Sequence, residues 1–185
     1  LICAGLLAGC ATSPQQTANP PVEPPGVSIH QAAWKGDTAA IEQHHAADTD
    51  MNLRNKWNAT PLHYAARAGQ AAAADLLVAK GANPAAKNNE GITPLHYSAS
   101  GGRQAIASLL IANSAEVNER DAEGLTPLHH AARGGHWQTI NLLVANGAEV
   151  NAKNAAGLTP LELADEKAAE VLRGHGGQSA IKLGA

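Results

Sequence analysis

The chain has 185 residues, of which 44% are hydrophobic, only 3% are aromatic and none is Phe. Its apolar core must therefore be built from Ala, Leu, Ile and Val, which favours closely packed helices over a sandwich or barrel filled by large rings. With 13 basic and 16 acidic residues the formal net charge is -3, too little positive charge for a nucleic-acid-binding protein, and both cysteines lie in the first ten residues, which excludes cysteine chemistry from the rest of the chain.

Residues 1–9 are similar to the apolar part of a secretory signal peptide. They are uncharged and small or apolar, and too few to span a bilayer, which needs about 20 apolar residues. The stretch Leu7-Ala8-Gly9-Cys10 resembles the lipobox of bacterial lipoproteins. That resemblance implies cleavage before Cys10, acylation of this cysteine, for example with palmitate, and, because Ala11 rather than Asp follows, sorting to the outer membrane. The alternative, a buried N-terminal helix turn, is disfavoured because the next residues cannot extend a helix.

Residues 10–26 are predicted to be a tether. Five of the sixteen residues from Ala11 to Gly26 are prolines, which excludes helix and sheet ladders. An extended, partly polyproline segment of about 3 Å per residue would span about 50 Å. It would hold a folded domain away from the surface of a membrane.

Residues 27–177 repeat with a period of 33. Thr-Pro-Leu-His begins at Thr60, Thr93 and Thr126, Thr159 begins Thr-Pro-Leu-Glu, and Val27-Ser28-Ile29-His30 is a degenerate first copy. In each copy, Thr is expected to cap a first helix and Pro to take the first helical position, where its missing N–H costs nothing. A second apolar helix follows, and Gly81 and Gly147 are expected to end it in the left-handed conformation, with Ser114 at that place in the third copy.

This period and motif resemble those of ankyrin repeats, over residues from about 22 to 177. The resemblance implies an all-α solenoid of helix–turn–helix repeats joined by short β-hairpin loops. We predict about five repeats, three of them full and two of them caps, because the end copies depart from the pattern. In the first copy Gln43, His44 and His45 replace an apolar trio, and in the last copy residues 165–173 are too few for two full helices. Residues 178–185 are expected to form a flexible tail.

The nine histidines raise the question of a metal site. One repeat position holds His30, His63, His96 and His129, and the ankyrin resemblance implies that this histidine hydrogen-bonds the neighbouring turn. Side chains one repeat apart stand about 10 Å from each other, too far for ligands at about 2 Å from one Zn²⁺. The adjacent pairs His44-His45 and His129-His130 point different ways on a helix and are weak candidates. No nucleophile elbow, phosphate-binding loop or pair of carboxylates appears, so we expect no enzymatic activity, no cofactor and no metal.

The ankyrin resemblance implies that function resides on the concave face formed by the loop tips and the first helices. The predicted partner-binding residues are those that vary there: Trp34, Lys35, Lys56, Trp57, Arg67, Glu90, Ile92, Ser100, Glu123, Leu125 and Arg133. We predict that Trp34, Trp57, Arg67 and Arg133 form the centre of this patch, because Trp and Arg dominate interface hot spots. In the alternative interpretation, Trp57 folds back on its own loop and Trp34 covers the end of the stack. Trp137 is expected in the core.

The expected function is therefore a protein–protein interaction module, monomeric when free and held by lipid on the periplasmic face of the outer membrane. One role is that of an immunity protein, which neutralises a secreted antibacterial effector such as a lipase or a peptidoglycan hydrolase. The alternative is a periplasmic scaffold or accessory protein that supports an envelope enzyme such as a catalase. A metal-dependent or hydrolytic enzyme is the third and least favoured reading.

Overall fold

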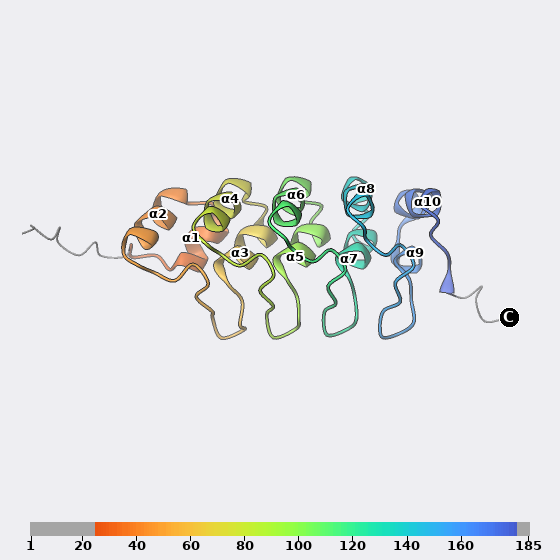
Figure 1. Ribbon diagram of the computed structural model, residues 1–185, viewed down its shortest axis with the longest axis horizontal. Coiled ribbons are helices and arrows are strands. Elements are labelled where there is room, and N and C mark those ends of the chain that lie inside the picture. Colours follow the sequence, from red (N-terminus) through yellow and green to blue (C-terminus); the bar gives the residue numbers. More distant parts are fainter. Residues whose placement is uncertain (1–24, 181–185) are drawn as a thin grey trace, which may run out of the picture.

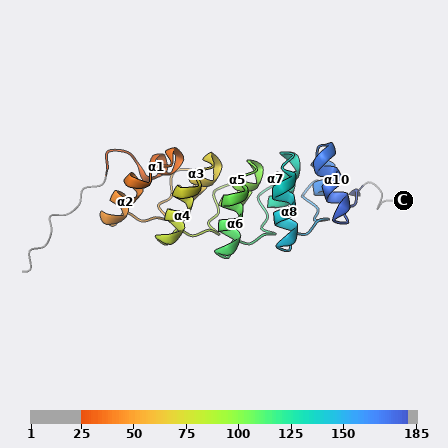
Figure 2. The same ribbon diagram turned by 90° about the horizontal axis from the view of Figure 1, so that it is seen from above.

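The computed structural model describes residues 25–180, which form a row of helix pairs stacked in chain order (Figure 1). The first helices of the pairs are α1 (Ile29–Lys35), α3 (Pro61–Ala68), α5 (Pro94–Ser100), α7 (Pro127–Arg133) and α9 (Pro160–Leu163). The second helices are α2 (Thr38–Ala46), α4 (Ala71–Ala79), α6 (Gln104–Ala112), α8 (Trp137–Ala145) and α10 (Glu166–Gly174). Figure 2 shows the first and second helices as two layers. The all-α solenoid is confirmed, whereas the predictions on residues 1–9 and Cys10, and most of the tether, lie outside the described residues.

The first helix of each full repeat begins with the predicted cap. Pro follows Thr at the first helical turn of α3, α5 and α7, and a capping box joins the Thr to the His three residues later. In the central repeat, the backbone N–H of Thr93 donates to Nδ1 of His96 at 3.1 Å. The proton of the neutral ring therefore sits on Nε2, which donates to the Leu125 carbonyl of the next repeat at 3.1 Å. The implied role of this histidine, a link between neighbouring repeats, is confirmed.

Small residues between the repeats allow the first helices to pack closely. Ala65, Ala66, Ala131 and Ala132 are fully buried. Two sets of leucines are also fully buried. One repeat position of the first helices contributes Leu62, Leu95 and Leu128, and one position of the second helices contributes Leu77, Leu110 and Leu143. The core is thus a continuous column of Ala and Leu, which explains why the chain needs no Phe.

The loops that project from the stack contain turns, and no strand is assigned anywhere in residues 25–180. Each loop closes with two backbone bonds at one residue. Asn55, for example, donates its N–H to the Ala59 carbonyl at 3.1 Å and accepts the Asn58 N–H at its own carbonyl at 2.8 Å. Neighbouring loops share one backbone–backbone bond each, such as Asn89 N–H to the Trp57 carbonyl at 3.0 Å. Because a strand ladder needs successive bonds, the expected β-hairpins are present in shape but not as strands.

The end repeats differ from those between them. In α2, His44 is buried, its Nε2 donates to the Val27 carbonyl at 2.8 Å and its Nδ1 lies 3.2 Å from Thr49 Oγ1. Only Gln43 and His45 of the polar trio are exposed. The first repeat therefore replaces one core leucine with a hydrogen-bonded histidine.

At the other end, α9 is shortened to four residues whereas α10 has nine, as many as the second helices of the full repeats. The chain then returns to the last repeat, where Gln178 N–H donates to Asn151 Oδ1 at 2.7 Å and the Gln178 carbonyl accepts from Thr159 Oγ1 at 2.9 Å. The predicted flexible tail, residues 178–185, thus begins with residues that are bonded to the domain, and residues 181–185 lie outside the described part. Within residues 25–180 no helix has the length and apolar character needed to cross a bilayer.

One repeat position, just after the second helix, has a left-handed backbone in three repeats, and a residue other than glycine there is expected to lower the free energy of unfolding. Gly81 (φ 91°), Ser114 (φ 68°) and Gly147 (φ 88°) occupy it, and a Cβ on either glycine would meet no atom within 4 Å. Only the backbone preference acts there, so Ser114→Gly should raise the free energy of unfolding by about 0.5–1 kcal/mol. Urea unfolding followed by circular dichroism measures the change. Gly147→Ser should lower stability by a similar amount, and two unchanged transitions would contradict the prediction.

Candidate binding surface

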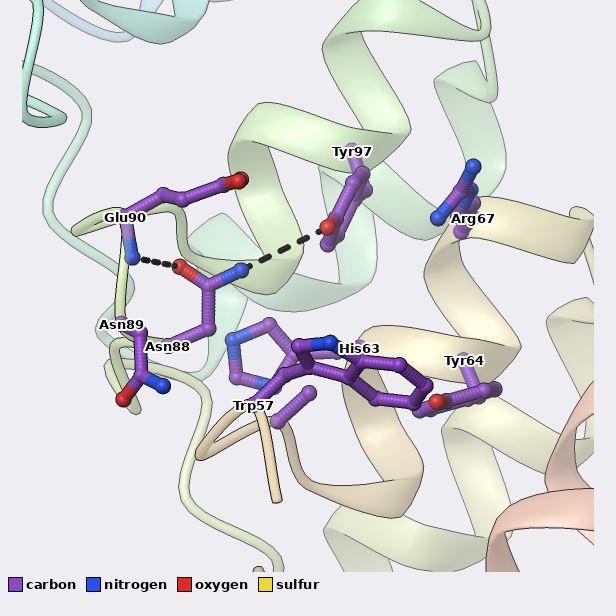
Figure 3. Close-up of a pocket in the computed structure, with 9 residues that line it drawn as sticks. Trp57, His63, Tyr64, Arg67, Asn88, Asn89, Glu90 and Tyr97 are labelled. Atoms are coloured by element: carbon purple, nitrogen blue, oxygen red, sulfur yellow. Dashed lines mark hydrogen bonds between the residues drawn. The ribbon is translucent and has the colours of Figure 1, made fainter. Parts of the chain in front are cut away.

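Two neighbouring cavities open on the face formed by the loops and the first helices. The first, of about 300 Å³, is lined by Trp57, Ala59, His63, Tyr64, Arg67, Asn88, Asn89, Glu90 and Tyr97 (Figure 3). The second, a wider depression of about 680 Å³, is lined by Ser28, His30, Gln31, Trp34, Asn55, Tyr64 and Arg67. Tyr64 and Arg67 belong to both. We call these lining residues together the aromatic groove, which extends from the first repeat to the third.

Two tryptophans form the exposed walls of the aromatic groove. The Trp34 side chain is 46% exposed and packs edge-on against Tyr64, with ring centroids 6.3 Å apart. The Trp57 side chain is 55% exposed, lies beside Tyr64 in Figure 3, and has the Lys56 ammonium 4.3 Å from its ring centroid. Because more than half of Trp57 faces solvent, its ring is not folded away beneath its own loop. Both rings are thus available to a ligand.

Asparagines hold the two tyrosines of the groove in place. Asn88 Oδ1 accepts the backbone N–H groups of Glu90 and Ile92, each at 2.9 Å, so its Nδ2 points toward the Tyr97 hydroxyl, 3.5 Å away. Asn55 makes the same bond to Tyr64 at 2.8 Å. Since each phenol oxygen accepts a hydrogen bond from an amide, its own O–H is left to donate elsewhere. Burial raises the pKa of Tyr97, which keeps this hydroxyl protonated.

Arg67 and Glu90 place opposite charges on two sides of the first cavity (Figure 3). The Arg67 guanidinium carbon lies 5.6 Å from the Tyr97 ring centroid, a cation–π distance. The Lys56 ammonium lies over the Trp57 ring, so the groove has the two cations Arg67 and Lys56 against the acid Glu90. The groove therefore suits a ligand that combines apolar rings, hydrogen-bond acceptors and an acidic group.

One repeat further along, the Asn–Tyr pair is replaced by Asp121 and His130. Asp121 Oδ1 accepts the backbone N–H groups of Glu123 and Leu125, each at 2.9 Å, and Oδ2 lies 2.8 Å from Nε2 of His130. With His96, they bring three possible ligand atoms within 4.8 Å of one another. Sequence analysis missed this cluster because its members come from two repeats, although the 33-residue register aligns Asp121 with Asn88 and His130 with Tyr97.

Both ring nitrogens of His96 are already hydrogen-bonded, which disfavours a metal ion at this cluster. Its Nδ1 accepts from Thr93 and its Nε2 donates to Leu125, so a metal would have to replace the link between two repeats. Desolvation by burial lowers the pKa of His96 to about 4, and the neighbouring His130 adds to this effect. The ring is neutral at pH 7 and serves the framework. The adjacent residues His129 and His130 do not act together, because Nε2 of His129 is bonded to the Leu158 carbonyl at 3.2 Å.

The structure brings together only part of the predicted binding patch. Trp34, Trp57, Arg67 and Glu90 line the aromatic groove. Five other predicted residues are exposed but line neither cavity: Lys35, Lys56, Ser100, Glu123 and Arg133. Arg133 is the last residue of α7 and lies two repeats beyond Arg67, which is in the last turn of α3. The structure therefore places three of the four residues of the predicted centre at the groove, and the role of Arg133 stays a prediction.

Leu125 was predicted to lie on the binding surface, but the structure buries it. Its side chain is only 4% exposed, and its carbonyl accepts the hydrogen bond from His96. Ile92 occupies the same repeat position, is half-buried and accepts from His63 at 3.0 Å. Both residues vary between repeats, yet they belong to the framework. Trp137, expected in the core, is half-buried beneath the Lys167 ammonium, 4.6 Å from its ring centroid.

Tyr64 and Tyr97 are the groove residues that sequence analysis missed. They are the two tyrosines of the chain, and each directly follows the histidine of a Thr-Pro-Leu-His motif. Their recurrence at one repeat position was the available signal. Position alone could not show that they face a cavity, because neighbouring motif residues are buried.

Comparison with known proteins agrees with the helix-pair geometry. A family model described as ankyrin repeats (3 copies) matches residues 29–121, and a second, ankyrin repeats (many copies), matches residues 109–164. No curated protein matches the chain. With half of its length matched by one family model and every described helix pair in the expected register, the chain belongs to the ankyrin repeat family.

Proposed function

We propose that the aromatic groove is the surface by which this protein binds a protein partner, and that the protein is not an enzyme. Ankyrin repeats are protein–protein interaction modules, and proteins built from them are generally non-enzymatic. The observation that carries the proposal is the exposure of Trp34 and Trp57 on either side of Tyr64 and Arg67. Trp, Tyr and Arg are the residues most enriched in interface hot spots.

The energetics of the two tryptophans support this assignment. A side chain of this size buries 150–250 Å² when it is fully covered, roughly 25 cal/mol of free energy per Å². About half of each ring is still exposed here, so a partner that covers both would gain several kcal/mol before the costs of association, by rough accounting. Each tryptophan also lines one of the two cavities, which gives an inserted side chain of the partner a pocket.

Replacing Trp57 and Arg67 together with Ala should weaken partner capture by about tenfold or more while leaving the helical circular dichroism unchanged, because both side chains are exposed. Capture is measured with the full chain immobilised in a periplasmic extract, followed by mass spectrometry and titration of the protein that is identified. Arg133→Ala is the matched control, since Arg133 holds the repeat position of Arg67 but lies outside the groove. Equal capture by the double variant and the control would remove the proposal.

For the biological role, we propose an immunity protein that neutralises a secreted antibacterial effector, a lipase or another toxin that attacks the envelope. The lipobox-like stretch ending at Cys10 supports a lipid anchor on the periplasmic side of the outer membrane, where such a toxin acts. Deletion of the gene should sensitise cells to a sister strain in a contact-competition assay. The parent gene should restore survival, and the Trp57/Arg67 double variant should not. Equal survival of the deletion strain would contradict the immunity role and favour the scaffold or accessory alternative.

A further inference from the structure

We propose that residues 20–25 of the chain itself, Pro-Pro-Val-Glu-Pro-Pro, occupy the aromatic groove when no protein partner is bound, with Glu23 paired to Arg67. Pro25 is the first residue that the structure describes. This inference rests on the proposed function in one respect only, that the groove is a binding surface.

The hydrogen-bonding groups of the groove match those of a proline-rich segment. Its walls offer donors: the indole N–H groups of Trp34 and Trp57, the hydroxyls of Tyr64 and Tyr97, and the guanidinium of Arg67. In residues 25–180, no other residue accepts a hydrogen bond from either indole. A proline contributes a carbonyl acceptor and an apolar ring but no N–H, so a proline-rich chain satisfies these donors without bringing unpaired donors of its own.

The spacing of the aromatic residues also matches. One turn of polyproline II contains three residues and rises by about 9 Å, and neighbouring packed helices are about 8–10 Å apart. Tyr64 and Tyr97 occupy one position in successive repeats, and the prolines at 21 and 24 are three residues apart. An extended segment can therefore place one proline face against each repeat.

The segment begins beside the groove. Ser28, three residues after Pro25, lines the wider cavity together with Trp34. Residues 20–25 in the polyproline conformation span about 15 Å, enough to cross from the first repeat to Arg67, which both cavities share. Because ligand and groove are on one chain, the effective concentration is on the order of millimolar, so weak contacts suffice for occupancy.

Charge selects the direction in which the segment lies. Glu23 is the only charged residue in residues 20–25. The groove offers it the cations Arg67, which lines both cavities, and Lys56, which lies over the Trp57 ring, whereas the acid Glu90 lines only the cavity that does not contain Ser28. Placing Glu23 at Arg67 pairs opposite charges and keeps it on the side of the groove nearest Ser28.

The three tryptophans allow a direct test on the full chain, since each indole N–H gives one nitrogen-correlated resonance that a Trp→Phe variant assigns. A soluble paramagnetic agent broadens exposed indole resonances. Replacing Pro20, Pro21 and Pro24 with Ser should remove the protection of Trp34 and Trp57 and leave the broadening of Trp137 unchanged. Equal broadening of Trp34 and Trp57 in parent and variant overturns the proposal. Protection that disappears on dilution identifies a second copy as the occupant and overturns it as well.

A charge swap tests the pairing. Glu23→Lys and Arg67→Glu should each remove the protection of Trp34 and Trp57, and the double variant should restore it. A double variant as unprotected as the single variants overturns the pairing of Glu23 with Arg67. The proline variant should still capture the protein partner, so failure of self-docking and failure of the proposed function are separate results.

Discussion

Lowering the pH from 7 to 5 should reduce the free energy of unfolding by about 4 kcal/mol through His63 and His96, because these buried histidines must stay neutral in the folded chain, and by more through His129, whose pKa burial also lowers. Burial is the main cause that lowers the pKa of His63 and of His96 to about 4, from an ordinary value of 6.5. The unfolded chain therefore takes up protons before the folded one does. The stability that these residues contribute is complete above pH 6.5 and is lost as the pH falls toward 4, about 2 kcal/mol for each at pH 5.

Urea unfolding at pH 7, 6 and 5, followed by circular dichroism, measures this loss. His63→Gln should be less stable at pH 7 but should lose about 2 kcal/mol less than the parent on acidification, because one titrating group is removed. Ile106→Val is the control, since it destabilises a fully buried site of α6 by about 1 kcal/mol without removing a titratable group. A parent that loses no stability between pH 7 and 5 would show that these histidines are protonated without cost.

The framework was predictable because its residues act locally and recur. Thr93 and His96 are three residues apart, and their bond within the cap repeats wherever the motif does. The bond from the histidine to the next loop spans 29 residues in each full repeat, so one period contains it. Ser114 was likewise recognised from its position alone, since it stands where Gly81 and Gly147 do.

The aromatic groove was predictable only in part, because it is formed between repeats. Trp57 and Arg67 were found as variable, exposed residues, but the phenol of Tyr64 that joins their two cavities was not. Variation between repeats also selected Leu125, whose side chain lies under the loop. The 33-residue repeat identifies which residues occupy equivalent positions. Whether each of these side chains is exposed depends on how the neighbouring loop folds, which the repeat does not show. The lipid anchor at Cys10 and the tether stay predictions, because they lie outside the described residues except for the last residues of the tether.

His96→Ala should cost about 4 kcal/mol of unfolding free energy at pH 7, whereas His30→Ala, at the same repeat position in the first copy, should cost about 1 kcal/mol. The His96 side chain is fully buried. Its loss leaves a cavity, and it leaves the Thr93 N–H and the Leu125 carbonyl buried without the partner they had. His30 is half-buried, and within residues 25–180 its ring bonds only the Ala59 carbonyl, at 3.0 Å, because Val27 replaces the capping threonine. Equal costs at the two positions, measured by urea unfolding, would contradict the link between repeats.

The pH dependence of this difference separates the hydrogen bonds and the cavity from the titration. At pH 5 the parent has already lost about 2 kcal/mol through His96, and the His96→Ala variant has no such group to protonate. Its destabilisation should therefore shrink from about 4 kcal/mol at pH 7 to about 2 kcal/mol at pH 5. A destabilisation that is the same at both pH values would mean that His96 fills space and makes its bonds without its ionisation being coupled to folding. The shrinkage instead requires that the ring stay neutral in the folded chain at a pH where the unfolded chain is protonated, which is what its burial predicts.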